Sequence, residues 1–159
     1  MIMERQKDIV QNLATGLDAS IAFFRALTQE QLDTQIYADG GRWTTRQMLA
    51  HFITIEKSMH WLFRDLLAGG AGTPDEFDLD RFNLTQVPKL DPLSLDELID
   101  RFRAVRRGTI QIAEELTDGD LDRRGMHPFL GTGTLERFIR WAYEHVRLHE
   151  ADIRRTLGI

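Results

Sequence analysis

Three histidines are the residues of this sequence best placed to do chemistry. His145 and His149 lie four residues apart in a helical pattern that begins at Thr134. At that spacing both side chains point to one face of a helix, and here it is the apolar face. His51 lies on the apolar face of a second amphipathic segment, which begins at Thr44. Three inward-facing histidines on two helices predict a site for one divalent metal ion with open coordination positions.

The same histidines have a structural interpretation. A single inward-facing histidine such as His51 is often a core residue whose ring nitrogen hydrogen-bonds a backbone carbonyl. A His-x3-His pair also occurs on helices that bind no metal. The presence of three such histidines on two apolar faces favours the metal site. Because the chain contains no cysteine, its protein ligands must be nitrogen and oxygen atoms, and any reacting thiol must come from a co-substrate.

Two carboxylates are spaced to support such a site. Glu56 lies shortly after His51 in the second segment, and Asp152 follows His149 by less than one helical turn. A carboxylate in such a place can orient a histidine ligand or accept a proton from a reacting group. For Glu56, a solvated position at the edge of the core is the alternative.

Four further residues are candidates for lining a substrate pocket: Trp43, Asn83, Arg106 and Trp141. Trp43 has a structural alternative, because an apolar residue before a helix cap can pack as a hydrophobic staple. Arg106 has one as well, with its stem packed on the core edge and its charged head in solvent.

The composition describes one globular domain, which we expect to span residues 1–159. Hydrophobic residues make up 42% of the chain and charged residues 28%, a balance typical of a folded domain. The net charge of −5 argues against a nucleic-acid partner, which would need clustered basic residues. No apolar run is long enough to span a membrane, and the N-terminus lacks a signal-peptide core. We therefore expect a cytoplasmic protein that acts on a small molecule.

Hydrophobic periodicity predicts four long amphipathic helices, at residues 3–27, 44–68, 94–116 and 134–157. The second and third helices begin with capping boxes, in which Thr44 precedes Gln47 and Ser94 precedes Glu97. The segments 27–33 and 116–122 are short helical turns in this prediction. Residues 69–93 show no sustained period and are expected to form a long connection that covers a site. The predicted fold class is all-α, a four-helix bundle.

The depth of the histidines along their helices tests the topology. At 1.5 Å per residue, His51 lies about 9 Å from the start of its helix and His149 about 12 Å from the end of its own. In an up-down-up-down bundle these depths would differ by about 13 Å, whereas in an up-down-down-up bundle they agree within about 3 Å. A shared metal site therefore predicts that residues 69–93 cross the bundle between the second and third helices.

Three motifs, in this order, resemble the DinB-like superfamily. They are Trp43-Thr44…Leu49-Ala-His51…Glu56, His127-Pro-x-x-Gly131-x-x-Thr134-Leu135, and His145-x3-His149-x3-Ile153. They are most similar to the branch that contains thiol-dependent transferases and maleylpyruvate isomerases. The resemblance implies an up-down-down-up four-helix bundle, often a homodimer, with a divalent metal ion, commonly zinc or nickel, on three histidines. It places His51, His145 and His149 at the ligand positions, and we do not carry His127 over as a ligand.

Three functions are consistent with these observations. Family members with assigned activities use low-molecular-weight thiols such as mycothiol, bacillithiol or glutathione. The resemblance therefore implies a metal-dependent transfer of a thiol to an electrophile, or an isomerisation through a thiol adduct. A metal-dependent hydrolase is the second hypothesis, with Glu56 or Asp152 as the proton acceptor. The third is a non-catalytic, metal-stabilised bundle that binds a small molecule or a partner, for example in a stress response.

Overall fold

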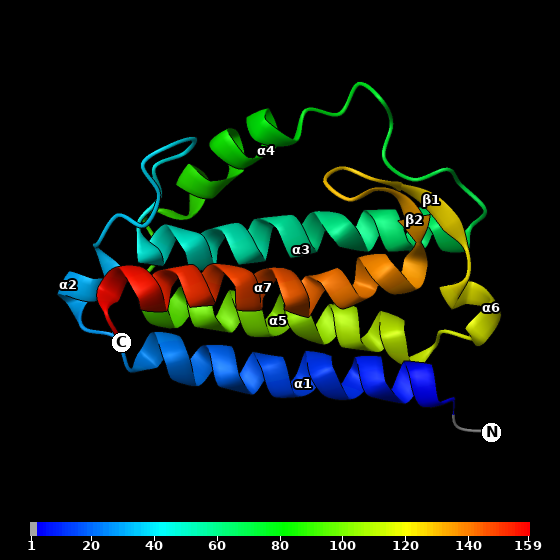
Figure 1. Cartoon of the computed structure of the whole chain (residues 1–159), viewed down its shortest axis with the longest axis horizontal. Helices are drawn as coiled ribbons and strands as arrows, with labels where there is room; N and C mark the ends of the chain where they lie inside the picture. The colour runs from blue at the N-terminus through cyan, green and yellow to red at the C-terminus, as the bar shows by residue number, and fades with distance from the viewer. Residues whose placement is uncertain (1–2) are drawn as a thin grey trace.

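Four long helices dominate the computed structural model, which describes residues 3–159 (Figure 1). They are α1 (Glu4–Arg25), α3 (Thr45–Leu67), α5 (Leu95–Glu114) and α7 (Leu135–Leu157). Two four-residue helices, α2 (Gln29–Leu32) and α6 (Asp118–Leu121), follow α1 and α5 at the predicted turns. The all-α fold class is confirmed.

Three of the four long helices, α3, α5 and α7, begin where their sequences provide caps. The Thr44 and Ser94 side chains accept hydrogen bonds from the backbone N–H groups of Gln47 and Glu97, whose own side chains bond back to the cap residues. Both predicted capping boxes are therefore present. At the start of α7, the Thr134 side chain accepts a hydrogen bond from the backbone of Arg137 without a box. These caps satisfy N–H groups that a helix N-terminus leaves without partners.

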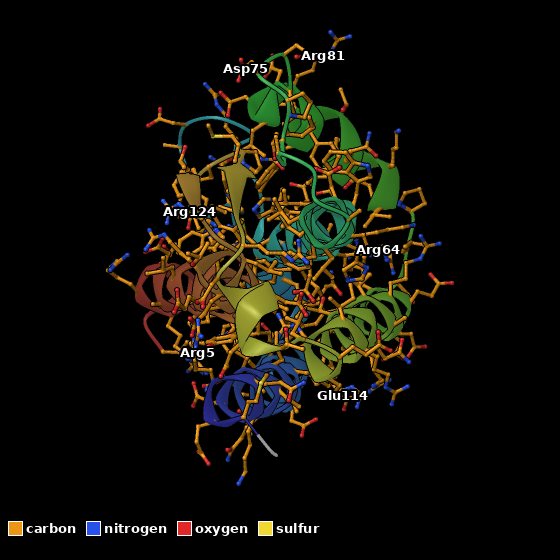
Figure 2. All side chains as sticks on the ribbon, turned by 90° about the vertical axis from the view of Figure 1, so that its right-hand side faces the viewer. Arg5, Arg64, Asp75, Arg81, Glu114 and Arg124 are labelled. Atoms are coloured by element: carbon orange, nitrogen blue, oxygen red, sulfur yellow. The ribbon has the colours of Figure 1, made fainter. Side chains whose placement is uncertain are left out.

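The bundle has the predicted up-down-down-up topology. In Figure 1, α1 and α7 run in one direction while α3 and α5 run in the other. Ion pairs agree with this, since the first turn of α1 meets the first turn of α7 through Arg5 and Glu136. Likewise Glu56 of α3 pairs with Arg106 of α5, each about three turns after its helix cap. Figure 2, which looks along the bundle, shows the four long helices around a common core.

Two apolar clusters fill the core. One, which includes Phe24, Phe52 and Phe102, lies toward the α2 end of the bundle, and the other, which includes Leu13 and Phe63, lies toward the α6 end. A buried ion pair, Glu56 of α3 with Arg106 of α5, lies between the two clusters. This core holds α3 and α7 at the spacing that the histidines require.

The crossover between α3 and α5 contains regular structure that the sequence analysis did not predict. It includes α4 (Leu79–Gln86) and a short 3-10 helix, η1 (Val87–Leu90). The half-buried positions of α4 are Leu79, Phe82, Asn83 and Gln86, and two of these are polar, so periodicity gives no clear signal for this helix. The long connection expected from the sequence therefore contains helical structure. The segment does cross the bundle, and α4 lies above α3 in Figure 1.

A small antiparallel hairpin, which periodicity does not predict, precedes α7. It consists of β1 (Arg124–His127) and β2 (Gly131–Thr134), with His127 opposite Gly131. Four-residue strands that contain glycine give no period-two signal. The hairpin is held against the crossover, because the Gly72 backbone, at φ 91°, approaches Met126 so closely that a Cβ would lie 2.6 Å from the Met126 carbonyl oxygen. No helix within residues 3–159 is both long and apolar enough to cross a membrane.

Candidate metal centre

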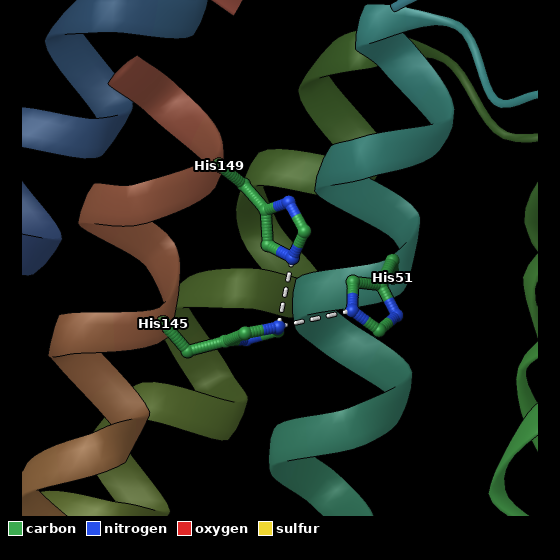
Figure 3. Close-up of side chains that lie close together, drawn as sticks. All are labelled: His51, His145 and His149. Carbon is green, nitrogen blue, oxygen red and sulfur yellow. Dashed lines mark hydrogen bonds between the residues drawn. The ribbon is translucent and has the colours of Figure 1, made fainter. Parts of the chain in front are cut away.

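The three predicted histidines converge on one point between α3 and α7 (Figure 3). The Nε2 atom of His145 lies 3.3 Å from Nε2 of His51 and 2.9 Å from Nε2 of His149. The one cluster of metal-ligating side chains found among the described residues consists of these three. The up-down-down-up topology thus brings together ligands that are separated by 94 residues.

The geometry fits a divalent metal ion. Zinc–nitrogen bonds of about 2.0–2.1 Å at tetrahedral or octahedral angles hold ligand nitrogens about 2.9–3.4 Å apart. The two printed Nε2 separations, 3.3 and 2.9 Å, lie within that range. Hydrogen bonds alone would satisfy the cluster poorly, because the neutral His145 ring can donate from Nε2 to only one of its two neighbours. Three protein ligands also leave coordination positions open, as in catalytic sites.

The surroundings keep the histidine rings neutral. Burial, and to a smaller extent the nearby His149, lowers the pKa of His51 to about 3. Burial, together with the neighbouring histidines, lowers the pKa of His145 to about 2. Burial also lowers the pKa of His149, against the opposing effect of the Asp152 carboxylate. Neutral imidazoles present the nitrogen lone pairs that a metal ion requires.

Packing and one hydrogen-bonded chain hold the rings in place. The His51 ring lies 4.9 Å from the Trp43 ring, centroid to centroid, and its Nδ1 atom is buried with no hydrogen-bond partner in the described part of the chain. His149 is held differently. Its Nδ1 atom lies 2.7 Å from the hydroxyl of Tyr37, which donates a 2.6 Å hydrogen bond to Asp152.

This chain of contacts selects the tautomer of His149. Burial raises the pKa of Tyr37, and the hydrogen bond to Asp152 raises it further, so the hydroxyl stays protonated at neutral pH. Because its one proton goes to Asp152, the hydroxyl must accept from the protonated Nδ1 of His149. The lone pair of His149 then lies on Nε2, facing the other two rings.

Asp152 was predicted from its spacing to His149, whereas Tyr37 was not predicted. Asp152 reaches His149 through the tyrosine hydroxyl. Tyr37 lies in the loop between α2 and α3, which a hydrogen bond from the Ile36 backbone to Trp43 helps to close. Tyr37 is 112 residues away from His149 in the chain. Nothing in the periodicity of the sequence marks it.

Glu56 and Arg106 pair with each other, and Arg106 does not line the cavity beside the three histidines. Arg106 is 1% exposed and Glu56 3% exposed, and the guanidinium donates to both carboxylate oxygens at 2.8–3.1 Å. Arg106 also donates to the carbonyls of Leu13 and Ala142, and Glu56 accepts from Thr109. The substrate-binding role of Arg106 and its alternative with a solvated head are both wrong, as is the solvated position for Glu56. Neither side chain hydrogen-bonds a histidine of the centre.

A cavity of about 710 Å³ opens onto the three histidines. Its walls come from the 37–43 loop, α3, α4, the hairpin turn and α7. Trp43, Asn83 and Trp141, three of the four candidate pocket residues, line it, and Arg106 does not. Trp141 lies 5.4 Å from the His145 ring and stacks on Phe129 at 5.8 Å, centroid to centroid. Asn83 Oδ1 is buried without a hydrogen-bond partner among the described residues.

Comparison with known proteins agrees with this geometry. The profile of the DinB superfamily matches residues 12–153. Among solved structures, the chain is similar to YfiT from Bacillus subtilis, described as a probable metal-dependent hydrolase with an unusual four-helix bundle topology. The two share 22% sequence identity and superpose with a TM-score of 0.76, over 99% of this chain and 91% of YfiT. No curated protein was similar enough to count as a match. On the extent of the sequence match, the chain belongs to the DinB superfamily.

Proposed function

We propose that this protein is a divalent-metal-dependent enzyme that transfers a low-molecular-weight thiol to an electrophilic small molecule. The observation that carries the proposal is the convergence of three neutral histidine nitrogens at the base of a largely apolar cavity. His51, His145 and His149 would hold the ion, for which zinc and nickel are the candidates. When bound, the ion supplies positive charge that lowers the pKa of a thiol or water molecule beside it.

The state of the nearby carboxylates favours a thiol as the nucleophile. Activation of water by hydrolases commonly uses a side chain that accepts a proton. Within residues 3–159, Glu56 is engaged by Arg106 and Thr109, and Asp152 is engaged by Tyr37 and Arg155. A thiol is more acidic than water and needs less help from a base.

The chain's own residues then orient and enclose the reactants. Tyr37 and Asp152 hold the His149 ring, and the Trp43 and Trp141 rings form apolar walls beside His51 and His145. The thiol loses its proton to solvent, and its sulfur forms a bond to the electrophilic carbon. The leaving group departs with the electron pair of the bond that breaks. Apolar walls keep water away from the thiolate, which makes it more reactive.

Hydrolysis is the second candidate function. It is supported by the similarity to YfiT, which is described as a probable metal-dependent hydrolase. In that case the same three histidines would hold the ion, and water would replace the thiol as the nucleophile. Of the two candidate bases, Asp152 is the one joined to the centre by hydrogen bonds, through Tyr37.

A comparison of two reactions distinguishes these functions. Protein loaded with zinc or with nickel is incubated with 1-chloro-2,4-dinitrobenzene and either mycothiol, bacillithiol or glutathione, and separately with 4-nitrophenyl acetate without thiol. We expect formation of the thioether with at least one thiol, and its loss in His145→Ala. The matched control is His60→Ala, because His60 lies on α3 but outside the centre and hydrogen-bonds Thr109. Ester hydrolysis without any thioether would contradict the transferase and support the hydrolase.

A further inference from the structure

The cavity is lined by a fourth histidine, itself buried, that the metal centre does not use. His127, the last residue of β1, lines the cavity together with Phe138 and His145. It is 4% exposed, and its ring packs on Phe138 at 5.1 Å between centroids. Its charge, when present, would lie close enough to His145 to lower the pKa of that residue.

The hairpin turn determines which nitrogen of His127 carries the proton. The backbone N–H groups of Phe129 and Leu130 both donate to Nδ1, each at 3.0 Å. Nδ1 is therefore an acceptor, and the neutral ring must carry its proton on Nε2. Burial, and to a smaller extent the nearby Arg137, lowers the pKa of His127 to about 4. The ring is thus a neutral donor at pH 7, with its N–H on the side away from the turn.

That N–H group lacks an acceptor. Nε2 of His127 is buried and has no hydrogen-bond partner among residues 3–159. A buried donor without an acceptor destabilises a folded chain, and such groups are uncommon. The hydrogen bonds of the turn account for the position of Nδ1. They do not account for a buried N–H group at Nε2. A ligand in the cavity that brings an oxygen atom to Nε2 would satisfy the group.

The cavity walls indicate what kind of molecule would bring that oxygen. Aromatic side chains line this part of the cavity, where Phe138 packs on the His127 ring and Phe129 of the turn stacks on Trp141, and they favour an apolar, aromatic body. A carboxylate would lose its hydration against these rings, and the Nε2–H group that it would meet is neutral. A carbonyl oxygen costs less to bury and matches one neutral N–H group.

We propose that His127 binds the carbonyl oxygen of an apolar, aromatic-bodied ligand through Nε2–H, and so selects carbonyl compounds at this cavity. The ligand's apolar part packs on Phe129 and Trp141, and the three histidines line the same cavity. This deepens the proposed function by naming the substrate class, and it rests on that function only for the use of the same cavity. The binding itself requires neither a thiol nor turnover.

A pair of probes of the same shape tests the proposal. Acetophenone carries a carbonyl oxygen where isopropenylbenzene carries a methylene group. Binding of each is measured by quenching of tryptophan fluorescence, on zinc-loaded and metal-free protein, because in the metal-free protein a carbonyl cannot bind an ion. One neutral hydrogen bond corresponds to a preference for acetophenone of about threefold to tenfold.

Two substitutions distinguish the acceptor role of His127 Nδ1 from the donor role of Nε2. His127→Asn keeps an acceptor for the turn but removes the Nε2–H donor, so we expect it to fold and to lose the preference for acetophenone. His127→Gln can place an amide N–H near the position of Nε2 and is expected to restore part of the preference at some cost in stability. Nitrogen NMR of the wild-type ring is expected to show the Nε2–H tautomer and a shift of Nε2 on adding acetophenone.

Each remaining outcome would overturn the proposal. These are an Nδ1–H tautomer, equal binding of the two probes, binding of neither probe, or a preference that His127→Asn retains. If that variant does not fold, the tautomer and the acetophenone-dependent shift in the wild-type protein decide. Because no step uses a thiol, an absence of thiol transfer would refute the proposed function and leave this result unaffected.

Discussion

The Tyr37 hydroxyl lies 2.7 Å from Nδ1 of His149 and joins that ring to the Asp152 carboxylate. The loop between α2 and α3 is thereby connected to the centre formed by α3 and α7. Groups that hold the far nitrogen of a histidine ligand fix its tautomer and its direction. The centre therefore depends on a loop residue as well as on the helix faces that carry its ligands.

Tyr37→Phe is expected to weaken metal binding by about 10- to 100-fold, because it removes the hydroxyl that holds His149. Affinity for zinc is measured by competition with a chromogenic chelator. Tyr143→Phe is the matched control, since Tyr143 is the only other tyrosine in the chain and its hydroxyl bonds Arg140. Equal affinities for the two variants would show that the Tyr37 contact does not support the centre.

Single substitution of any of the three histidines is expected to abolish stoichiometric metal binding. The physical reason is that two imidazoles hold a divalent ion much more weakly than three. Elemental analysis of protein purified without a His-tag, for the wild type and for His51→Ala, measures this directly. His60→Ala is the control and should keep its metal. If the wild type binds neither zinc nor nickel and neither metal changes its thermal stability, the three histidines are core residues.

Arg106→Met is expected to lower the free energy of unfolding by about 3–5 kcal/mol, because it leaves the Glu56 carboxylate buried without its partner. Urea denaturation measures the loss. Adding Glu56→Leu to Arg106→Met should recover part of it, since the double variant buries no lone charge. The control is Asp100→Asn, which breaks an exposed pair with Arg103 and should leave the midpoint nearly unchanged. A small loss in Arg106→Met would mean that water reaches Glu56.

Glu136→Gln is expected to destabilise the protein near neutral pH and to have less effect in acid. Hydrogen bonds from Arg5, and then from Arg140, lower the pKa of Glu136 below its usual 4.5. A carboxylate whose pKa is lowered on folding contributes stability above its unfolded pKa and loses it as the pH falls through the folded value. Urea denaturation of both proteins at pH 7 and below pH 4 tests this. A difference between them that stays constant with pH would contradict the prediction.

Local features of the sequence were sufficient to predict the main helices and the three histidines that converge. Thr44 and Ser94 begin helices because a cap and its partner lie within one turn of each other. His145 and His149 share a face because the helical period places them there. Even the crossover followed from the sequence, since only one order of the helices brings His51 to the depth of His149.

The sequence did not predict the short elements, α4 and the β1–β2 hairpin. The α4 helix buries none of its residues, and the strands of the hairpin are four residues long, so neither has a period to detect. Their positions are set by contacts with α3 and with the Gly72 backbone. Tertiary packing thus overrides weak local preference in these segments.

The sequence by itself predicted the bundle and the three histidines that converge, because these follow from spacing within one helix and from the order of the helices, while the family followed from the resemblance of three motifs. Only the tertiary structure decided that Tyr37 holds His149, that Arg106 is buried against Glu56, and that Nε2 of His127 is buried without a partner among the described residues, in a side chain that lines the cavity. Helical period gives the direction of a side chain about its own axis. It carries no information about which distant segment lies opposite, and that partner decides whether a polar group is solvated, paired or left to bind a ligand.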